Sequence, residues 1–266
     1  MADSSKAGRI KRFPNLMEER IMSFEDYLKI KHPVPYIFEL HKGQKALLYL
    51  GAQHSADSNH PQFGAFKSAF ERFKPELVLL EGGDWPEKYA SEQEAIKHAE
   101  VAFLSYLARK YDVPSRSCEP QNKEEIKSLS RKFSREHIFA HYALRSITGF
   151  FHKEGHTRVG RAIIGFKEDS AWKDFDYSLE NLRGIHRGLF KKDIDVNDRD
   201  FYVKITNPTL GFSIINEVAA AATKLRDEYV VKLIKRSFKK YNRILIIMGA
   251  SHAVMQEPAL RGYFIS

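Results

Sequence analysis

The sequence predicts an α/β fold: a single domain with a central, mostly parallel sheet flanked by helices, plus a largely helical middle excursion. One observation is a pair of aliphatic runs that both end in Gly-Ala-x-His. Leu47–Ser55 reads LLYLGAQHS, and Leu245–Ala253 reads LIIMGASHA. A short apolar run bounded by a glycine is typical of a buried strand. A second observation is that such runs alternate with helical patterns, which is typical of parallel βαβ units.

The individual elements follow from local patterns along the chain. Short apolar runs predict strands over residues 36–40, 45–50, 76–80, 115–118 and 244–248. Gly43 lies between the first two and predicts a hairpin. Helical spacing of apolar residues predicts helices over residues 22–31, 63–73, 87–111, 123–151 and 212–240. Residues 155–208 are polar and rich in glycine and aspartate, so we expect irregular structure there, and a short polar tail after the last strand.

The chain divides into an N-terminal arm, residues 1–34, and an α/β domain, residues 35–266. The arm is polar and basic at its start. Within the domain, the helical excursion covers about residues 121–212. It contains no repeat of fixed period and resembles an insertion or lid more than a second domain.

Composition indicates a soluble protein. Hydrophobic residues make up 43% of the chain, and no apolar run approaches the length of a membrane-spanning helix. The N-terminus lacks the apolar core of a secretory signal, and Cys118 is the single cysteine, so we expect a cytoplasmic location. The net charge of +9 is spread along the chain without a nucleic-acid-binding motif. We interpret it as a surface property and expect no nucleic-acid partner.

Four ionisable residues follow predicted strands and predict a metal site. His54, Glu81, Glu119 and His252 should lie at one edge of the sheet, where ligands gather in open α/β folds. Two imidazoles and a carboxylate suit a divalent ion such as manganese, cobalt or zinc. Such an ion can activate water, and a further carboxylate can act as general base. The alternative is that each residue merely caps the helix after its strand.

Three further residues are candidates for catalysis or substrate binding. Arg226 lies beside the apolar face of a predicted helix, so it could polarise a carbonyl or bind an acidic group. Its alternative is a solvated residue paired with Asp227 or Glu228. Asp57 and His60 could bind substrate or tune His54, but turn formation explains them nearly as well.

The order of these motifs resembles the TraB/Tiki superfamily, which also takes in erythromycin esterase-like and ChaN-like proteins. The resemblance spans roughly residues 45–255. It is carried by GAQHSADSNHPQF, Glu81-Gly82-Gly83, Glu119-Pro120, Arg226-Asp227 in a long helix, and GASHA near the C-terminus. The paired Gly-x-x-His elements are its most specific part.

The resemblance implies an α/β sheet with the site at the strand ends. It matches His54 and His252 to the paired histidines, Glu81 to the acidic residue and Arg226 to the helical arginine; Glu119 matches the esterase-like branch. Tiki proteins are metal-dependent proteases, erythromycin esterases cleave a lactone, and ChaN-like proteins bind haem. Unlike animal Tiki proteins, this sequence shows no signal peptide or membrane anchor, and the middle segment does not align by eye.

Taken together, these features favour a metal-dependent hydrolase that acts on a peptide, ester or lactone bond. His54, Glu81 and His252 would hold the metal. Glu119 would be the general base, Arg226 would polarise the carbonyl or bind an acidic group, and His54 would also take part in catalysis. One alternative is a metal-free esterase in which a histidine deprotonates water. Another is a non-catalytic protein that binds haem or a small ligand.

Other signals are weaker. His137 and His141, and likewise His152 and His156, are spaced one helical turn apart, but REHIFAHY lacks the glutamate of HExxH. We interpret these histidines as structural, although His141 could face the site. The sequence has no Gly-x-Ser-x-Gly elbow and no intact phosphate loop. Cys118 could line the site but is more typical of a small buried apolar residue.

Overall fold

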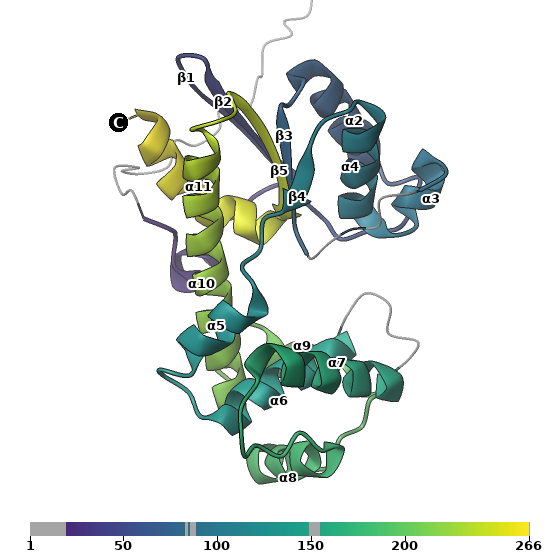
Figure 1. Cartoon of the computed structure of the whole chain (residues 1–266), viewed down its shortest axis with the longest axis vertical. Coiled ribbons are helices and arrows are strands. Elements are labelled where there is room, and N and C mark those ends of the chain that lie inside the picture. The colour runs from purple at the N-terminus through teal and green to yellow at the C-terminus, as the bar shows by residue number, and fades with distance from the viewer. Residues whose placement is uncertain (1–19, 83–84, 86–88, 149–154, 266) are drawn as a thin grey trace, which may run out of the picture.

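A computed structural model describes residues 20–82, 85, 89–148 and 155–265, and it confirms the predicted α/β fold (Figure 1). The strands form one sheet in the order β1-β2-β5-β3-β4. Their bounds are β1 (Tyr36–Lys42), β2 (Lys45–Ala52), β3 (Leu77–Leu80), β4 (Ser115–Ser117) and β5 (Arg243–Gly249). β1 pairs antiparallel with β2 through the predicted turn at Gly43, and the other neighbours are parallel. The last strand in sequence therefore lies in the middle of the sheet.

Helices cover both faces of the sheet because the parallel strands are apolar on both sides. On one face, Leu48, Val78 and Leu245 pack with α2 (Gln62–Phe73) and α4 (Ala99–Lys110). On the other, Tyr49 and Ile246 pack with α10 (Ile214–Ser237) and α11 (Ala250–Ile265). Figure 1 shows the two helix layers on either side of the strands.

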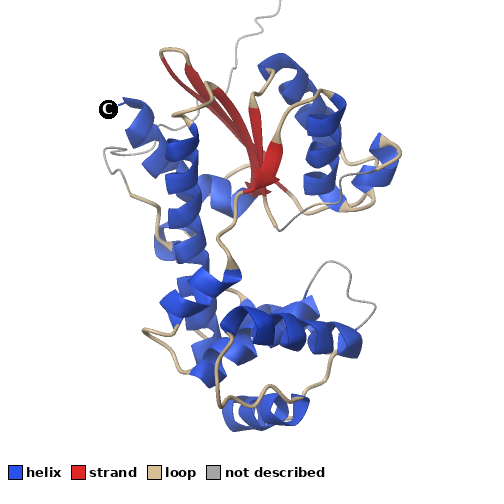
Figure 2. Cartoon of the chain, in the orientation of Figure 1, coloured by secondary structure: helices blue, strands red, loops and turns tan. Residues whose placement is uncertain are grey.

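The middle excursion has a core of its own and joins the sheet through α10 (Figure 2). It contains α5 (Asn122–Leu129), α6 (Arg135–Arg145), the 3-10 helix η1 (Ser146–Thr148), α7 (Gly155–Ser170), α8 (Leu179–Phe190) and α9 (Arg199–Thr206). The prediction that residues 155–208 are irregular is wrong. Ser178 and Asp198 cap two short helices there, and Leu182 and Tyr202 are fully buried. The apolar residues of α8 do follow helical spacing at Leu182, Ile185 and Leu189, so a signal for this helix was present in the sequence.

Two longer helix predictions and the predicted polar tail also differ from the structure. The expected helix over residues 87–111 is two helices, α3 (Glu92–Ile96) and α4, because Ala99, the first residue of α4, has a φ of +74°. The expected helix over residues 123–151 is interrupted between α5 and α6, and residues 149–151 lie outside the described part. The expected polar tail is α11, which continues through Pro258.

The described part of the predicted N-terminal arm lies against the sheet domain. Within residues 22–31, only α1 (Phe24–Tyr27) is helical, and it contacts α11. The Met22 N–H donates to the Met255 carbonyl at 2.8 Å. Residues 1–19 lie outside the described residues. Among the described helices, none is both long and apolar enough to cross a membrane.

Gly51, at the end of β2, allows α11 to approach the sheet closely. A Cβ added at Gly51 would lie 2.7 Å from the Ala253 Cβ and 2.7 Å from the Tyr36 carbonyl oxygen. Both are parts of rigid elements that cannot move independently. The glycine of the first Gly-Ala-x-His motif is therefore a packing requirement.

We expect Gly51→Ala to lower the free energy of unfolding by about 1–3 kcal/mol, because the added methyl group overpacks this contact. The control is Gly64→Ala on the exposed side of α2, where an added Cβ meets nothing within 4 Å. That change should raise the free energy of unfolding by about 0.5–1 kcal/mol. Urea denaturation of both variants measures the difference. Equal effects would contradict the packing role of Gly51.

Candidate active site at the carboxyl edge of the sheet

The four predicted strand-end residues lie at one edge of the sheet. β5 lies between β2 and β3, with Ala52 opposite Gly249 and Leu80 opposite Ile247. His54 therefore follows a neighbour of β5 on one side, and Glu81 follows a neighbour on the other. His252 itself lies in the first turn of α11, not in the predicted loop, because α11 begins at Ala250 directly after β5.

The His54 ring is held by a buried carboxylate. Its Nδ1 lies 2.6 Å from Oε1 of Glu100, which is 1% exposed, and the Ser55 N–H donates to the other oxygen of Glu100 at 3.3 Å. Because a carboxylate oxygen accepts, Nδ1–H is the donor and Nε2 faces away. The hydrogen bond to Glu100, aided by the Glu81 charge, raises the pKa of His54 to about 9 against the opposing effect of burial.

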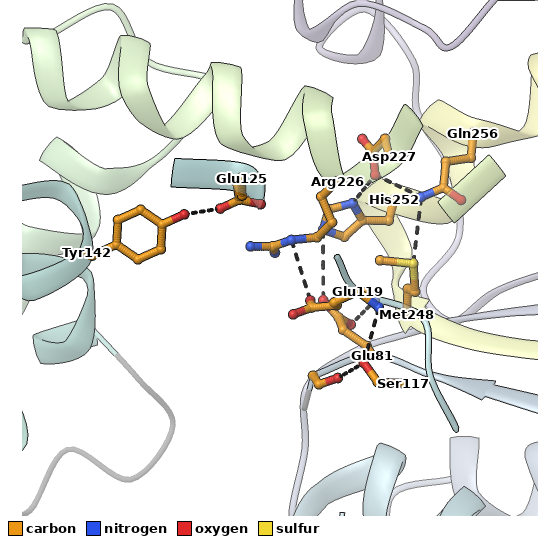
Figure 3. A network of polar contacts seen from close by, with 12 residues as sticks. Glu81, Ser117, Glu119, Glu125, Tyr142, Arg226, Asp227, Met248, His252 and Gln256 are labelled. Carbon is orange, nitrogen blue, oxygen red and sulfur yellow. Dashed lines mark hydrogen bonds and ion pairs between the residues drawn. The ribbon is translucent and has the colours of Figure 1, made fainter. Parts of the chain in front are cut away.

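His252 is held in the same way from the other face of the sheet (Figure 3). Its Nδ1 lies 2.6 Å from Oδ1 of the fully buried Asp227. Gln256 donates to the same oxygen at 2.8 Å, and Tyr49 donates to Gln256 at 3.0 Å. Burial lowers the pKa of His252, but the Asp227 and Glu81 charges outweigh it and the pKa is raised. The Nε2 atom is left 3.9 Å from Oε1 of Glu81.

Glu81 lies between the two histidines. The Gly249 N–H donates to Oε2 of Glu81 at 2.7 Å and fixes the carboxylate over the end of β5. A Cβ added at Gly249 would lie 3.3 Å from Nε2 of His54 and 3.9 Å from Oε2 of Glu81. The glycine of the second Gly-Ala-x-His motif thus leaves space next to both the His54 Nε2 and the Glu81 carboxylate.

Glu119 and Arg226 form an ion pair next to Glu81. Nε of Arg226 lies 3.5 Å from Oε1 of Glu119, and Arg226 is 7% exposed. Figure 3 shows Arg226 reaching from α10 over Glu119, with its guanidinium directed toward Tyr142 and Glu125. Burial opposes the charged form of Arg226, yet the Glu119 carboxylate and other acidic neighbours raise its pKa. Arg226 is therefore buried and paired with Glu119, not solvated and paired with Asp227. Asp227 pairs with His252.

A cavity of about 450 Å³ lies at this edge, between the sheet, α1, α6 and α10. Residues from the strand ends, from α11 and from the helical excursion line it together. They include His54, Glu81, Gly249, Ser251, His252, Met255, Arg226, Thr223, His141, Arg145, Asn207, Phe24 and Tyr27. His54, Glu81, His252 and Arg226 thus line one space of the size that small-molecule sites occupy, and Glu119 is not among its lining residues.

Asp57 and His60 do not line this cavity. The Asp57 carboxylate accepts the Asn59 N–H at 2.9 Å, and His60 accepts the Gln62 N–H at 3.3 Å. These contacts form a turn and the start of α2. Turn formation accounts for these contacts of Asp57 and His60. A role of the two residues in substrate binding stays a prediction.

The competing histidines do not make a shared site in the described chain. His141 is buried and lines the cavity, while His137, one turn earlier on α6, is partly exposed and does not line it. His152 and the side chain of His156 lie outside what the structure describes. Cys118 is fully buried, as a small apolar residue would be, and burial raises the pKa of its thiol.

Sequence reasoning missed the role of Glu100 and Asp227, the two carboxylates that hold the histidines, and it missed Arg145. A signal was present for the first two. Glu100 sits in the apolar run AEVAFLSYL, and Asp227 lies on the face of α10 that carries Val230 and Val231. A carboxylate at a buried helical position needs a partner, because an unpaired buried charge is strongly unfavourable.

The types of donor atom at this site are those that bind divalent metal ions. Histidines that bind metals donate their other ring N–H to a carboxylate or carbonyl, as both histidines do here. His54 Nε2, His252 Nε2 and the Glu81 carboxylate are the ligand types of manganese, cobalt and zinc sites. As the side chains stand, however, no three His, Cys, Asp or Glu residues in the described ranges are grouped closely enough to hold an ion.

The comparisons with known proteins place the chain in no family. No protein-family model matches the sequence, and no curated protein matches it. The resemblance to the TraB/Tiki superfamily therefore rests on the short motifs and stays a prediction.

We expect the His54 ring to titrate near pH 9 in metal-free protein, and Glu100→Gln to lower its pKa toward the ordinary value of 6.5. The stabilisation from this pair is fully present below about pH 6.5, where the unfolded ring is also protonated. It is lost as the pH rises through about 9. Histidine NMR titration measures this, with the surface residue His41 as internal control. An unchanged His54 pKa in Glu100→Gln would contradict the assigned cause.

Proposed function

We propose that this protein is a metal-dependent hydrolase that cleaves an ester, lactone or peptide bond at the carboxyl edge of its sheet. The observation that carries the proposal is the matched pair of carboxylate–imidazole contacts. Glu100 and Asp227 each bind an Nδ1 at 2.6 Å, and both Nε2 atoms are left near Glu81. Two histidines that are oriented in the same way from opposite faces of the sheet are suited to bind the same metal ion.

In this proposal His54, His252 and Glu81 hold the ion. A divalent ion bound there supplies Lewis-acid activation of water and of the bond to be cleaved. The resemblance to the TraB/Tiki superfamily supports the same three residues. Manganese, cobalt and zinc remain the candidates, since all three accept nitrogen and carboxylate ligands.

Glu119 and Arg226 act beside the ligands. Glu119 does not need to serve as a ligand, so its carboxylate can take the proton from the attacking water as general base. Arg226, 3.5 Å from Glu119, pairs with that carboxylate and provides positive charge that can polarise the substrate carbonyl or bind an acidic group. Arg226 lines the cavity, and Glu119 lies directly behind it as its ion-pair partner.

The metal-free alternative is less well supported. A histidine that serves as general base must be unprotonated at the working pH. The pKa of His54 is raised to about 9, so its ring carries a proton at neutral pH, and the pKa of His252 is also raised, which favours its protonated form. Each Nε2 becomes a free electron-pair donor when its proton is displaced by a metal ion. The single Cys118 favours a reducing compartment, and we expect the enzyme to act in the cytoplasm.

We expect the purified protein, after incubation with manganese, cobalt or zinc and removal of excess ion, to retain about one ion per chain, because a two-histidine, one-carboxylate set suffices to bind one ion. His54→Ala and His252→Ala should each lose the ion, while His41→Ala on exposed β1 should keep it. Elemental analysis measures the content. An empty wild-type protein after all three ions would contradict the proposal.

We expect Glu119→Gln to keep the ion but to hydrolyse chromogenic esters, small lactones or peptides about 10²–10⁴-fold more slowly, because it lacks the general base. Thermal unfolding of the variant controls for loss of the Arg226 pair. Full activity of Glu119→Gln would remove Glu119 from the mechanism. A loaded protein that cleaves none of these substrates would argue against hydrolysis itself.

A further inference from the structure

The cavity carries two arginines at the side where the helical excursion meets the sheet domain. Arg226 comes from α10 and Arg145 from α6, and both line the cavity. Arg226 is buried against Glu119, whereas Arg145 keeps exposed surface. Because Arg145 also lines the cavity, solvent or a ligand inside it reaches this side chain.

Arg145 has no side-chain hydrogen bond or ion pair among the described residues. The positive charge of Arg226, followed by burial, lowers the pKa of the Arg145 guanidinium. Glu119 and Glu125 act in the opposite direction, but Glu119 pairs with Arg226 and Glu125 accepts from the Tyr142 hydroxyl. Arg145 and Arg226 therefore repel each other, and neither of these two carboxylates makes an ion pair with Arg145 in the described residues.

His141 adds an unpartnered group to the same wall. It is 2% exposed, and neither of its ring nitrogens has a hydrogen-bond partner in the described structure. Burial, with the charges of Arg145 and Arg226, lowers the pKa of His141 to about 3. The ring is neutral at pH 7 and keeps one N–H donor. An unsatisfied buried donor is unfavourable, and a ligand that accepts from it removes that penalty.

The sign of the charge in the cavity favours an anion. Among the described residues that line it, Glu81 is the one acidic residue, and it faces the two site histidines. The arginines lie on the side of α6 and α10. A carboxylate or phosphate between two guanidinium groups forms charge-assisted hydrogen bonds, and water-excluding walls strengthen them.

Apolar and uncharged polar side chains complete the lining. The apolar ones are Phe24 and Tyr27 of α1, Leu28 directly after it, Ala219 and Ala222 of α10, Met255 of α11 and Pro208, and the polar ones are Thr206, Asn207, Thr209, Thr223 and Ser251. With a volume of about 450 Å³, the cavity suits a small molecule that has both apolar and polar parts. A folded protein substrate does not fit such a space.

We propose that the substrate is a small molecule with an acidic group, which Arg145 and Arg226 bind while its scissile bond lies at Glu81. The substrate role rests on the proposed function, whereas the binding of the acidic group stands on the cavity alone. Among the classes named above, this favours acidic esters or lactones over protein substrates.

The test compares ligands that share an apolar body and differ in charge. Calorimetric titration of metal-free protein with hexanoate, hexyl phosphate and hexanamide measures binding without catalysis. We expect at least one of the two anions to bind about ten-fold or more tightly than hexanamide. The comparison between hexanoate and hexyl phosphate identifies which acidic group the site prefers. Equal binding of all three ligands would overturn the proposal.

Arg145→Gln is the decisive variant because the side chain has no partner in the described structure whose loss would unfold the protein. We expect it to weaken binding of the preferred anion about ten-fold or more and to leave hexanamide unaffected. Arg145→Lys should retain part of the affinity. The matched control is Arg131→Gln, which removes one exposed positive charge outside the cavity. Identical affinities for the two glutamine variants would overturn the assignment.

Failure of the two proposals can be told apart. If the anion binds through Arg145 but no ester is cleaved by metal-loaded protein, the acidic-group site stands and the hydrolase does not. If esters are cleaved but neutral and acidic esters of equal length react equally, the hydrolase stands and this inference is wrong.

Discussion

The insertion of β5 between β2 and β3 is the constraint on which the rest of the site depends. It brings Gly-Ala-x-His motifs from the two ends of the chain onto adjacent parallel strands, with Ala52 opposite Gly249. Gly51 then admits α11 against β2, and Gly249 leaves room between His54 and Glu81. A side chain at Gly51 would overlap Ala253 and Tyr36, and one at Gly249 would crowd the His54 ring. The fold thus brings two motifs that are far apart in the sequence to one edge of the sheet.

The two buried carboxylates explain why such a site is stable. Glu100 and Asp227 are 1% and 0% exposed, and an unpaired charge at either position would be strongly unfavourable. Each accepts from an imidazole Nδ1, and Oδ1 of Asp227 also accepts from Gln256, while Oδ2 of Asp227 has no hydrogen-bond partner among the described residues. This pairing stabilises the folded chain and at the same time orients both Nε2 atoms. The same contacts therefore serve folding and function.

The sequence was most informative where local patterns decide the structure. Aliphatic runs predicted the strands, and the shared edge of parallel strands predicted that His54, Glu81, Glu119 and His252 lie near one another. It was least informative where tertiary contacts decide. The break before α4 depends on a positive φ at Ala99, and the partners of the histidines come from helices 46 and 25 residues away. In the excursion the apolar residues of α8 do follow helical spacing, but the glycines and charged residues among them led to the irregular interpretation.

The most direct test of the central claim is a crystal structure of the protein soaked in manganese or zinc, with anomalous scattering used to locate the ion. The account predicts one strong peak in contact with Nε2 of His54, Nε2 of His252 and the Glu81 carboxylate. The Glu100 and Asp227 contacts to Nδ1 should be unchanged. No peak there at saturating metal, or a peak bound instead by histidines of α6, would contradict a metal site at the carboxyl edge of the sheet.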